Sequence, residues 1–169
     1  MDRLTEGRRP ILVLSGAVDL SPCDVLFVHR DAEREPHATR RAQIDAAVAQ
    51  QPSLPPVVGV VPVRMQEAWL LVDEGAIRQA AGNPNGTQPL GLPLLARLED
   101  LPDPKAMLYE VLREASGLSG RRRREVPVRQ HATRIPEFIE DFSPLRRLAA
   151  FQVLEAAVAH LVAAQGWAS

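Results

Sequence analysis

Short apolar runs separated by amphipathic stretches make up the first half of the chain. Val25–Val28 is apolar, with β-branched and aromatic side chains, and predicts a buried strand. The stretch between Thr39 and about Gln50 has an apolar face that contains Ile44 and Val48, which predicts an amphipathic helix. Val57–Val63 is a continuous β-branched run, typical of a parallel strand that is covered on both faces. Strand, helix and strand at this spacing predict a right-handed βαβ unit and therefore an α/β fold.

Helical patterns dominate the rest of the chain. Apolar positions at core spacing predict a buried helix from Met65 to about Val72, and Asp73 is expected to cap a second segment that Gly82 ends. The stretch Asn83–Pro93 lacks a phosphate-binding glycine pattern and is expected to be a plain loop. Residues from about 98 to 169 should be mainly helical. The expected boundaries there are Asp103-Pro104 at the start of one helix, Gly117 after its end, and Ser143-Pro144 at the start of the last helix.

Length and composition fit one intracellular domain. With 169 residues the chain suffices for one well-cored domain, so we expect a single domain over residues 1–169, with an atypical first unit over about residues 1–23. The apolar run Ile11–Leu14 is too short to classify as strand or helix. The single cysteine, Cys23, excludes an internal disulfide and suits a reducing cytoplasm, and it is expected to be a small core residue. No apolar run is long enough to span a membrane, and the N-terminus is not built like a signal peptide.

Charged residues follow the first predicted strand, at the position where ligands gather in open α/β sheets. Asp31 and Glu33 lie two residues apart, so both side chains could leave the same face of an extended backbone. Two carboxylates at such a point suit Mg²⁺, which takes one or two protein carboxylates and leaves room for substrate phosphates. The alternative is that acidic residues opening a helix only favour the positive end of its dipole.

A third carboxylate and several basic side chains extend this candidate site. Glu67 follows the second predicted strand, and Arg30 and Lys105 are candidate anion partners. His29 is a candidate general base or phosphate ligand, as is His37, although a histidine at a strand end is more often structural. Zinc-ligand spacing, a nucleophile elbow and a dinucleotide fingerprint are absent from the sequence. The set suits a magnesium site that polarises a phosphoryl oxygen or generates hydroxide from water.

The one strongly basic stretch is GLSGRRRR, from Gly117 to Arg124. It is expected to be flexible, and Arg122 and Arg123 are candidate phosphate contacts, with a solvated loop as the alternative. The whole chain carries 20 basic and 21 acidic residues, so its net charge argues neither for nor against nucleic acid. Aromatic residues are scarce, which argues against single-strand binding by base stacking.

The order of several motifs resembles a bacterial family, domain of unknown function 4276. The motifs are HRDAE from His29 to Glu33, VPVRMQEAWLLVD from Val61 to Asp73, DPK from Asp103 to Lys105, and a late Ser-Pro before an apolar helix. That family is similar to the TOPRIM fold of topoisomerases, primases and overcoming-lysogenisation-defect nucleases. The resemblance covers about Asp24 to the C-terminus. It implies a mainly parallel, Rossmann-like sheet flanked by helices and, by analogy, Mg²⁺- or Mn²⁺-dependent cleavage of nucleic acid in phage defence.

Residue by residue, the paired acids of the TOPRIM motif fall on Asp31 and Glu33, where the second acid is Glu instead of the usual Asp. Glu67 matches the Glu-Ala-Trp-Leu helix of the family, and Lys105 matches its Asp-Pro-Lys. A TOPRIM core also begins with a strand that ends in Glu-Gly. The only counterpart near the start is Glu6-Gly7, with too little chain after it for the helix and strand that should follow. The first unit therefore looks shortened, and the usual acid/base glutamate is missing.

Two functions from different classes follow from these observations. The first is a metal-dependent nuclease in which Asp31, Glu33 and Glu67 are metal ligands and catalytic residues. The second is a non-catalytic subunit or binding module of a defence or regulatory assembly, which would associate with a protein partner encoded nearby. The shortened first unit supports this second function. A small-molecule-binding α/β domain is a third alternative, for which the sequence contains no specific pocket signal.

Overall fold

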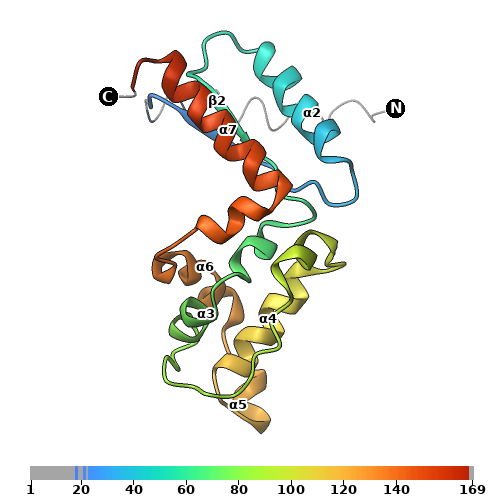
Figure 1. The fold of residues 1–169 in the computed structure, drawn as a ribbon, viewed down its shortest axis with the longest axis vertical. Helices are drawn as coiled ribbons and strands as arrows, with labels where there is room; N and C mark the ends of the chain where they lie inside the picture. The colour runs from blue at the N-terminus through green and yellow to red at the C-terminus, as the bar shows by residue number, and fades with distance from the viewer. Residues whose placement is uncertain (1–17, 19–20, 22, 168–169) are drawn as a thin grey trace. The chain divides into compact units, whose positions relative to one another are not determined.

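The computed structural model describes residues 18, 21 and 23–167, which form a mixed α/β structure with one two-stranded sheet among short helices (Figure 1). The chain divides into two compact units, which we call unit 1 (Met1–Val61 with Val153–Ser169) and unit 2 (Pro62–Gln152). The run Ile11–Leu14 and the Glu6-Gly7 pair lie outside the described residues.

Unit 1 is built on a pair of parallel strands, β1 (Leu26–His29) and β2 (Val57–Val60). The connecting helix, α2 (His37–Ala49), packs against β2. The pairing aligns His29 with Val60 at the carboxyl ends of the two strands. This arrangement confirms the parallel strand–helix–strand unit predicted from the sequence. β2 is shorter than predicted because Pro62, inside the apolar run, has no amide hydrogen to donate to a ladder.

The core of unit 1 lies between α2 and the carboxyl ends of the strands. Ile44 is the buried residue of α2. Gly59 in β2 allows α2 to approach closely, since a Cβ atom there would lie only 3.3 Å from Cδ of Arg41. The core residues and those packed against them are Ala32, Ile44, Val61, Val28 and Val48. Because Ala32 belongs to this core, the segment that carries the predicted acidic cluster is held against the unit.

Unit 2 is helical, and its central helices α3, α4 and α6 pack against one another (Figure 1). Its elements, with η for 3₁₀-helices, are η1 (Gln66–Leu70), α3 (Glu74–Ala80), η2 (Leu95–Asp100), α4 (Pro104–Ala115), α5 (Gly120–Arg124), α6 (Val128–Phe138), η3 (Ser143–Arg147) and the start of α7 (Ala149–Ala164). The largest fully buried apolar side chains of this core are Leu71, Ile77, Leu98, Leu108, Leu112, Ile135 and Leu145. None of the helices within residues 23–167 is both long and apolar enough to cross a membrane.

Two predicted helix caps are confirmed in unit 2. The Asp73 carboxylate accepts a hydrogen bond of 2.9 Å from the backbone N–H of Ala76 at the start of α3. Asp103 accepts one of 2.8 Å from the N–H of Ala106, with Pro104 at the first position of α4. Each bond satisfies an N–H group that has no partner within its own helix, which is why the local sequence was sufficient to locate these helix starts.

Several predicted elements take a different form. The helix expected from Met65 to Val72 is a 3₁₀-helix of five residues, Gln66–Leu70, and the extended conformation of Asp73, which caps α3, prevents it from continuing into α3. Ser143-Pro144 opens the 3₁₀-helix η3, while α7 begins only at Ala149. Cys23, expected in the core, is exposed. The basic stretch is also not a loop throughout, since Gly120–Arg124 forms the helix α5.

Candidate functional site

The end of β1 brings His29 and Asp31 together. His29 is the last residue of the strand, and the backbone N–H of Arg30 continues the ladder with a 2.9 Å hydrogen bond to the carbonyl oxygen of Val60. Asp31 follows, with its Oδ1 atom 3.2 Å from Nε2 of His29. Both side chains are partly accessible, at 42% and 30% exposure. The carboxylate faces Nε2, so Nδ1 is the ring nitrogen that is positioned to exchange a proton with a substrate or water.

Glu33 lies at a turn in the backbone. Its φ angle is 55°, in the left-handed region that residues other than glycine rarely adopt, and Glu35 N–H closes the turn onto the carbonyl oxygen of Ala32 at 2.9 Å. The expectation that Asp31 and Glu33 leave one face of an extended backbone is therefore wrong. Backbone strain of this kind costs of the order of 1–3 kcal/mol, and it occurs preferentially at ligand-binding and catalytic sites.

Arg40 of α2 holds this turn. Its Nη2 atom lies 3.5 Å from Oε2 of Glu33, and its Nε atom donates to the carbonyl oxygen of Ala32 at 3.5 Å. The Arg40 side chain is only 13% exposed, whereas that of Glu33 is 65% exposed. The amphipathic pattern over Thr39–Gln50 does not indicate this role of Arg40. No sequence signal could have revealed it, because Arg40 lies seven residues from Glu33 across a turn whose geometry the sequence does not predict.

In unit 2, Glu67 and Lys105 form an ion pair between two helices. Glu67 lies in the first turn of η1 and Lys105 in the first turn of α4, and Oε1 of Glu67 is 3.0 Å from Nζ of Lys105. The Glu67 side chain is 19% exposed and that of Lys105 47%. A lysine at the start of a helix opposes the helix dipole, and the carboxylate of Glu67 offsets this unfavourable charge. Packing of η1 on α4 thus accounts for the position of Lys105 without any ligand.

The structure therefore brings the predicted residues together in two groups, one in each unit. His29, Asp31 and Glu33 lie within five residues at the end of β1, while Glu67 and Lys105 share an ion pair in unit 2. Each of the three predicted carboxylates has a basic side chain next to it. Within the described part of the chain, no group of three or more His, Cys, Asp or Glu side chains is arranged to hold a metal ion.

Two of these residues still fit a magnesium ion. Mg²⁺ needs only one or two protein carboxylates and completes its shell with water and substrate oxygens. Asp31 and Glu33 supply hard oxygen ligands, and the Glu33–Arg40 pair is long, with the Glu33 side chain 65% exposed and the Arg40 side chain 13% exposed. A cation that took Glu33 would have to offset the loss of this carboxylate beside the mostly buried guanidinium of Arg40. Comparison of the chain with protein-family models, curated proteins and solved structures gave no match.

Proposed function

We propose that this protein is a Mg²⁺- or Mn²⁺-dependent phosphoryl-transfer enzyme, specifically a nuclease, whose centre is the segment after β1. The observation that carries the proposal is the His29–Asp31 pair at the carboxyl end of a parallel strand, at 3.2 Å. A partly exposed carboxylate–imidazole pair at this edge of a sheet combines a metal ligand and a base in one place. Glu33, two residues further along the chain, carries a second carboxylate at the left-handed turn.

The residues of this segment would divide the chemistry between them. Asp31 and Glu33 would hold the cation, which supplies charge stabilisation at a phosphoryl oxygen and lowers the pKa of water when bound. His29, oriented by Asp31 through Nε2, would accept the proton of the attacking water at Nδ1. Arg30, between them in the sequence, is exposed and carries a guanidinium suited to a phosphate oxygen. Arg40 would release Glu33 to the cation and retain its bond to the Ala32 carbonyl oxygen.

The motif resemblance to the TOPRIM-like family supports the same proposal. It gives Asp31 and Glu33 the part of the paired metal-binding acids, adds Glu67 as a third carboxylate and Lys105 as an anion contact, and implies nucleic acid as substrate and phage defence as the setting. These assignments rest on the quoted motifs alone.

The test combines metal binding with cleavage. Titrating the wild-type chain with Mg²⁺ or Mn²⁺ should raise its melting temperature, because a ligand at 100 times its Kd adds about 2.7 kcal/mol to the free energy of unfolding. Labelled DNA and RNA should be cleaved in the presence of metal. Asp31→Ala should abolish the thermal shift and lower the cleavage rate by about 100-fold or more.

The matched control is Asp45→Ala, which removes an aspartate of the same unit that pairs with Arg41 at 3.2 Å on the surface of α2. This variant should keep both the metal response and the cleavage. Cleavage by Asp31→Ala at the wild-type rate would contradict the proposed centre. Equal losses in Asp31→Ala and Asp45→Ala would show that the effect is one of general charge.

A second candidate function is a non-catalytic subunit or binding module of a defence or regulatory assembly. The observation that favours it is that Asp31, Glu33 and Glu67 each already have a basic partner within the chain. On this alternative the wild-type chain would show no metal-dependent thermal shift and no cleavage. It would instead form a stable complex with the product of a neighbouring gene, measurable by co-expression and size-exclusion chromatography with light scattering.

A further inference from the structure

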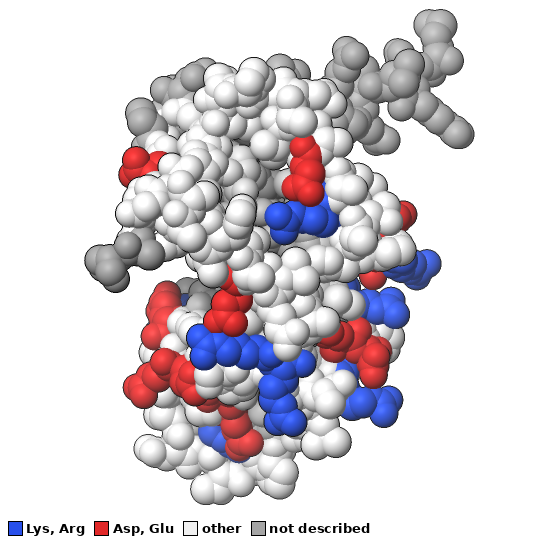
Figure 2. All heavy atoms as spheres, turned by 45° about the horizontal axis from the view of Figure 1, so that its top comes forward, with Lys and Arg blue, Asp and Glu red and all other residues white. Residues whose placement is uncertain are grey.

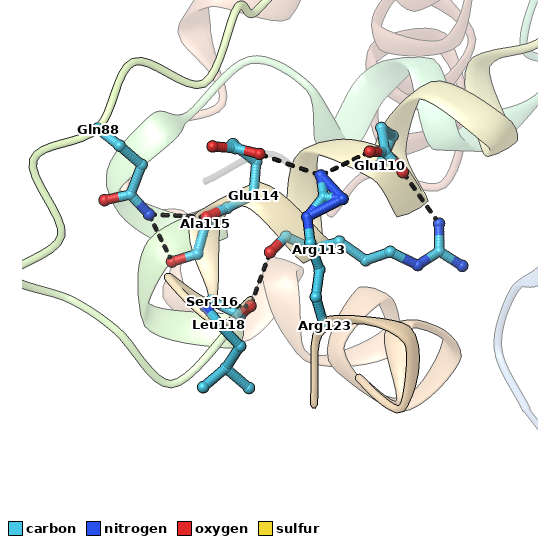
Figure 3. A network of polar contacts seen from close by, with 8 residues as sticks. All are labelled: Gln88, Glu110, Arg113, Glu114, Ala115, Ser116, Leu118 and Arg123. Carbon is cyan, nitrogen blue, oxygen red and sulfur yellow. Dashed lines mark hydrogen bonds and ion pairs between the residues drawn. The ribbon is translucent and has the colours of Figure 1, made fainter. Parts of the chain in front are cut away.

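The basic helix α5 is anchored to α4 through one of its arginines. Nη2 of Arg123 lies 2.6 Å from Oε1 of Glu110 and 3.0 Å from Oε2 of Glu114, as the close-up shows (Figure 3). Glu110 also binds Nη1 of Arg113 through its other oxygen at 3.2 Å. The Arg123 side chain is consequently only 29% exposed. Arg123, a candidate phosphate contact from the sequence, is engaged in this network.

The remaining charges of α4 and α5 separate into paired and unpaired groups. Nε of Arg121 lies 2.7 Å from Oε1 of Glu125, one turn further along the chain. Three arginines and three glutamates thus neutralise one another: Arg113, Arg121 and Arg123 with Glu110, Glu114 and Glu125. The positive charge that is left on α5 belongs to Arg122 and Arg124.

Arg122 and Arg124 are both exposed, and neither guanidinium forms an ion pair or hydrogen bond with any of residues 23–167. Successive residues of a helix are rotated by about 100°, so these two side chains leave α5 on either side of Arg123. Since Arg123 is directed at α4, Arg122 and Arg124 flank the contact line between the two helices. Arg129, in the first turn of α6, is a third exposed arginine without a described ion-pair partner.

This arrangement suits a repeated anion better than a single one. Two guanidinium groups on opposite sides of a short helix cannot converge on one small ion, but they can contact separate phosphates, which the planar guanidinium binds through two N–H groups. Residues 110–137 contain no Phe, Trp or Tyr on which a base could stack. Elsewhere, on the face that Figure 2 shows, acidic and basic side chains are interspersed, without a large area of one sign.

We propose that α5 is a sequence-independent contact for the phosphate backbone of a nucleic-acid duplex, made by Arg122 and Arg124. The lack of aromatic side chains favours a duplex over a single strand, whose binding depends on stacking. The contact lies within unit 2 and requires neither metal nor cleavage. It can therefore be tested, and can fail, separately from the phosphoryl-transfer centre proposed after β1.

The experiment measures binding of a fluorescein-labelled DNA duplex by fluorescence anisotropy, in EDTA, over a range of salt concentrations. Each phosphate contact contributes about 0.9 to the slope of log K against log salt, which corresponds to about 8-fold in affinity at about 0.1 M salt. The double variant Arg122→Gln/Arg124→Gln should therefore bind about 60-fold more weakly, with a slope smaller by about 2. Circular dichroism should show wild-type helix content, since neither side chain is buried.

Two matched variants of the same helix separate contact from general charge. Arg121→Gln/Glu125→Gln removes an exposed ion pair without changing net charge and should keep wild-type affinity. Arg121→Gln alone changes net charge as much as Arg122→Gln does, but should weaken binding clearly less. Equal weakening by these two single variants would overturn the proposal. So would the absence of salt-dependent binding by the wild type, tighter binding of single strands than of the duplex, or equally effective competition by an acidic peptide.

Discussion

Arg78 in α3 is the one charged residue that is buried among the described residues, with 6% exposure. Its Nη2 and Nε atoms lie 2.6 Å and 3.0 Å from Oε1 of Glu74, and Nη2 also donates to the carbonyl oxygen of Gln88 at 2.5 Å. Nη1 is buried without a hydrogen-bond acceptor in the described structure. The Glu74 side chain, by contrast, is 51% exposed. The two halves of this ion pair should therefore respond differently to removal.

Removing the exposed half should be the more damaging change. Glu74→Ala leaves a buried guanidinium without a carboxylate, which should lower the free energy of unfolding by about 3 kcal/mol. About 0.5 kcal/mol of this loss comes from the interaction of the Glu74 carboxylate with the positive end of the α3 helix dipole. Arg78→Met removes the buried charge together with the unsatisfied Nη1, leaves Glu74 to be hydrated, and refills most of the volume. Its cost should be about 1 kcal/mol or less, mainly the lost bond to Gln88.

Urea unfolding followed by tryptophan fluorescence measures this difference. Trp69 reports on the core of unit 2, because it is 7% exposed and packs edge-on against Phe151 with ring centroids 5.5 Å apart. Trp167 is 48% exposed and should change less on unfolding. The double variant Glu74→Ala/Arg78→Met should be closer in stability to Arg78→Met than to Glu74→Ala. If Arg78→Met lowers the free energy of unfolding as much as Glu74→Ala does, the loss comes from the ion pair itself, and the reasoning from burial is wrong.

Two further predictions concern the stability of unit 2. Asp103→Ala removes the side-chain cap of α4 and should lower the free energy of unfolding by about 1 kcal/mol. Asp103→Asn keeps a capping oxygen and should retain most of the wild-type stability. Equal losses of stability in the two variants would show that the cap bond contributes little. Burial and, secondarily, Arg134 lower the pKa of His131 from 6.5, so the unfolded chain binds this proton more readily. Stability should therefore fall as pH falls below about 6.5, until the folded-state pKa is passed. In urea unfolding measured above and below this pH range, His131→Gln should lose less stability on acidification than the wild type does. An unchanged pH dependence of the free energy of unfolding would count against a contribution from His131.

The parts of the fold that the sequence predicted are those that local interactions determine. The strand–helix–strand order follows from the periodicity of apolar residues over Val25–Val63, and the starts of α3 and α4 follow from Asp73 and Asp103, which bond to groups three residues away. α5 was not predicted, because four consecutive arginines repel one another locally. The helix is held by carboxylates of α4, nine and thirteen residues earlier, whose proximity depends on the packed structure.

The same distinction applies to the candidate site. The pattern of an apolar run followed by His29 and Asp31 placed both residues correctly at the end of a parallel strand. The turn at Glu33 could not be predicted, since glutamate, unlike glycine or asparagine, does not favour a positive φ. Nor could the sequence reveal the basic partners of the acids, because Arg40 and Lys105 reach them through the packing of α2 and α4.

The division of the chain has a consequence for the order in which it folds during synthesis. Unit 2 is one continuous stretch, Pro62–Gln152, whereas unit 1 combines the residues before it with Val153–Ser169. The chain is synthesised from its N-terminus, so every segment of unit 2 is made before the last segment of unit 1. Unit 1 therefore cannot be completed until Val153–Ser169 has left the ribosome, whereas unit 2 needs only one uninterrupted stretch of the chain.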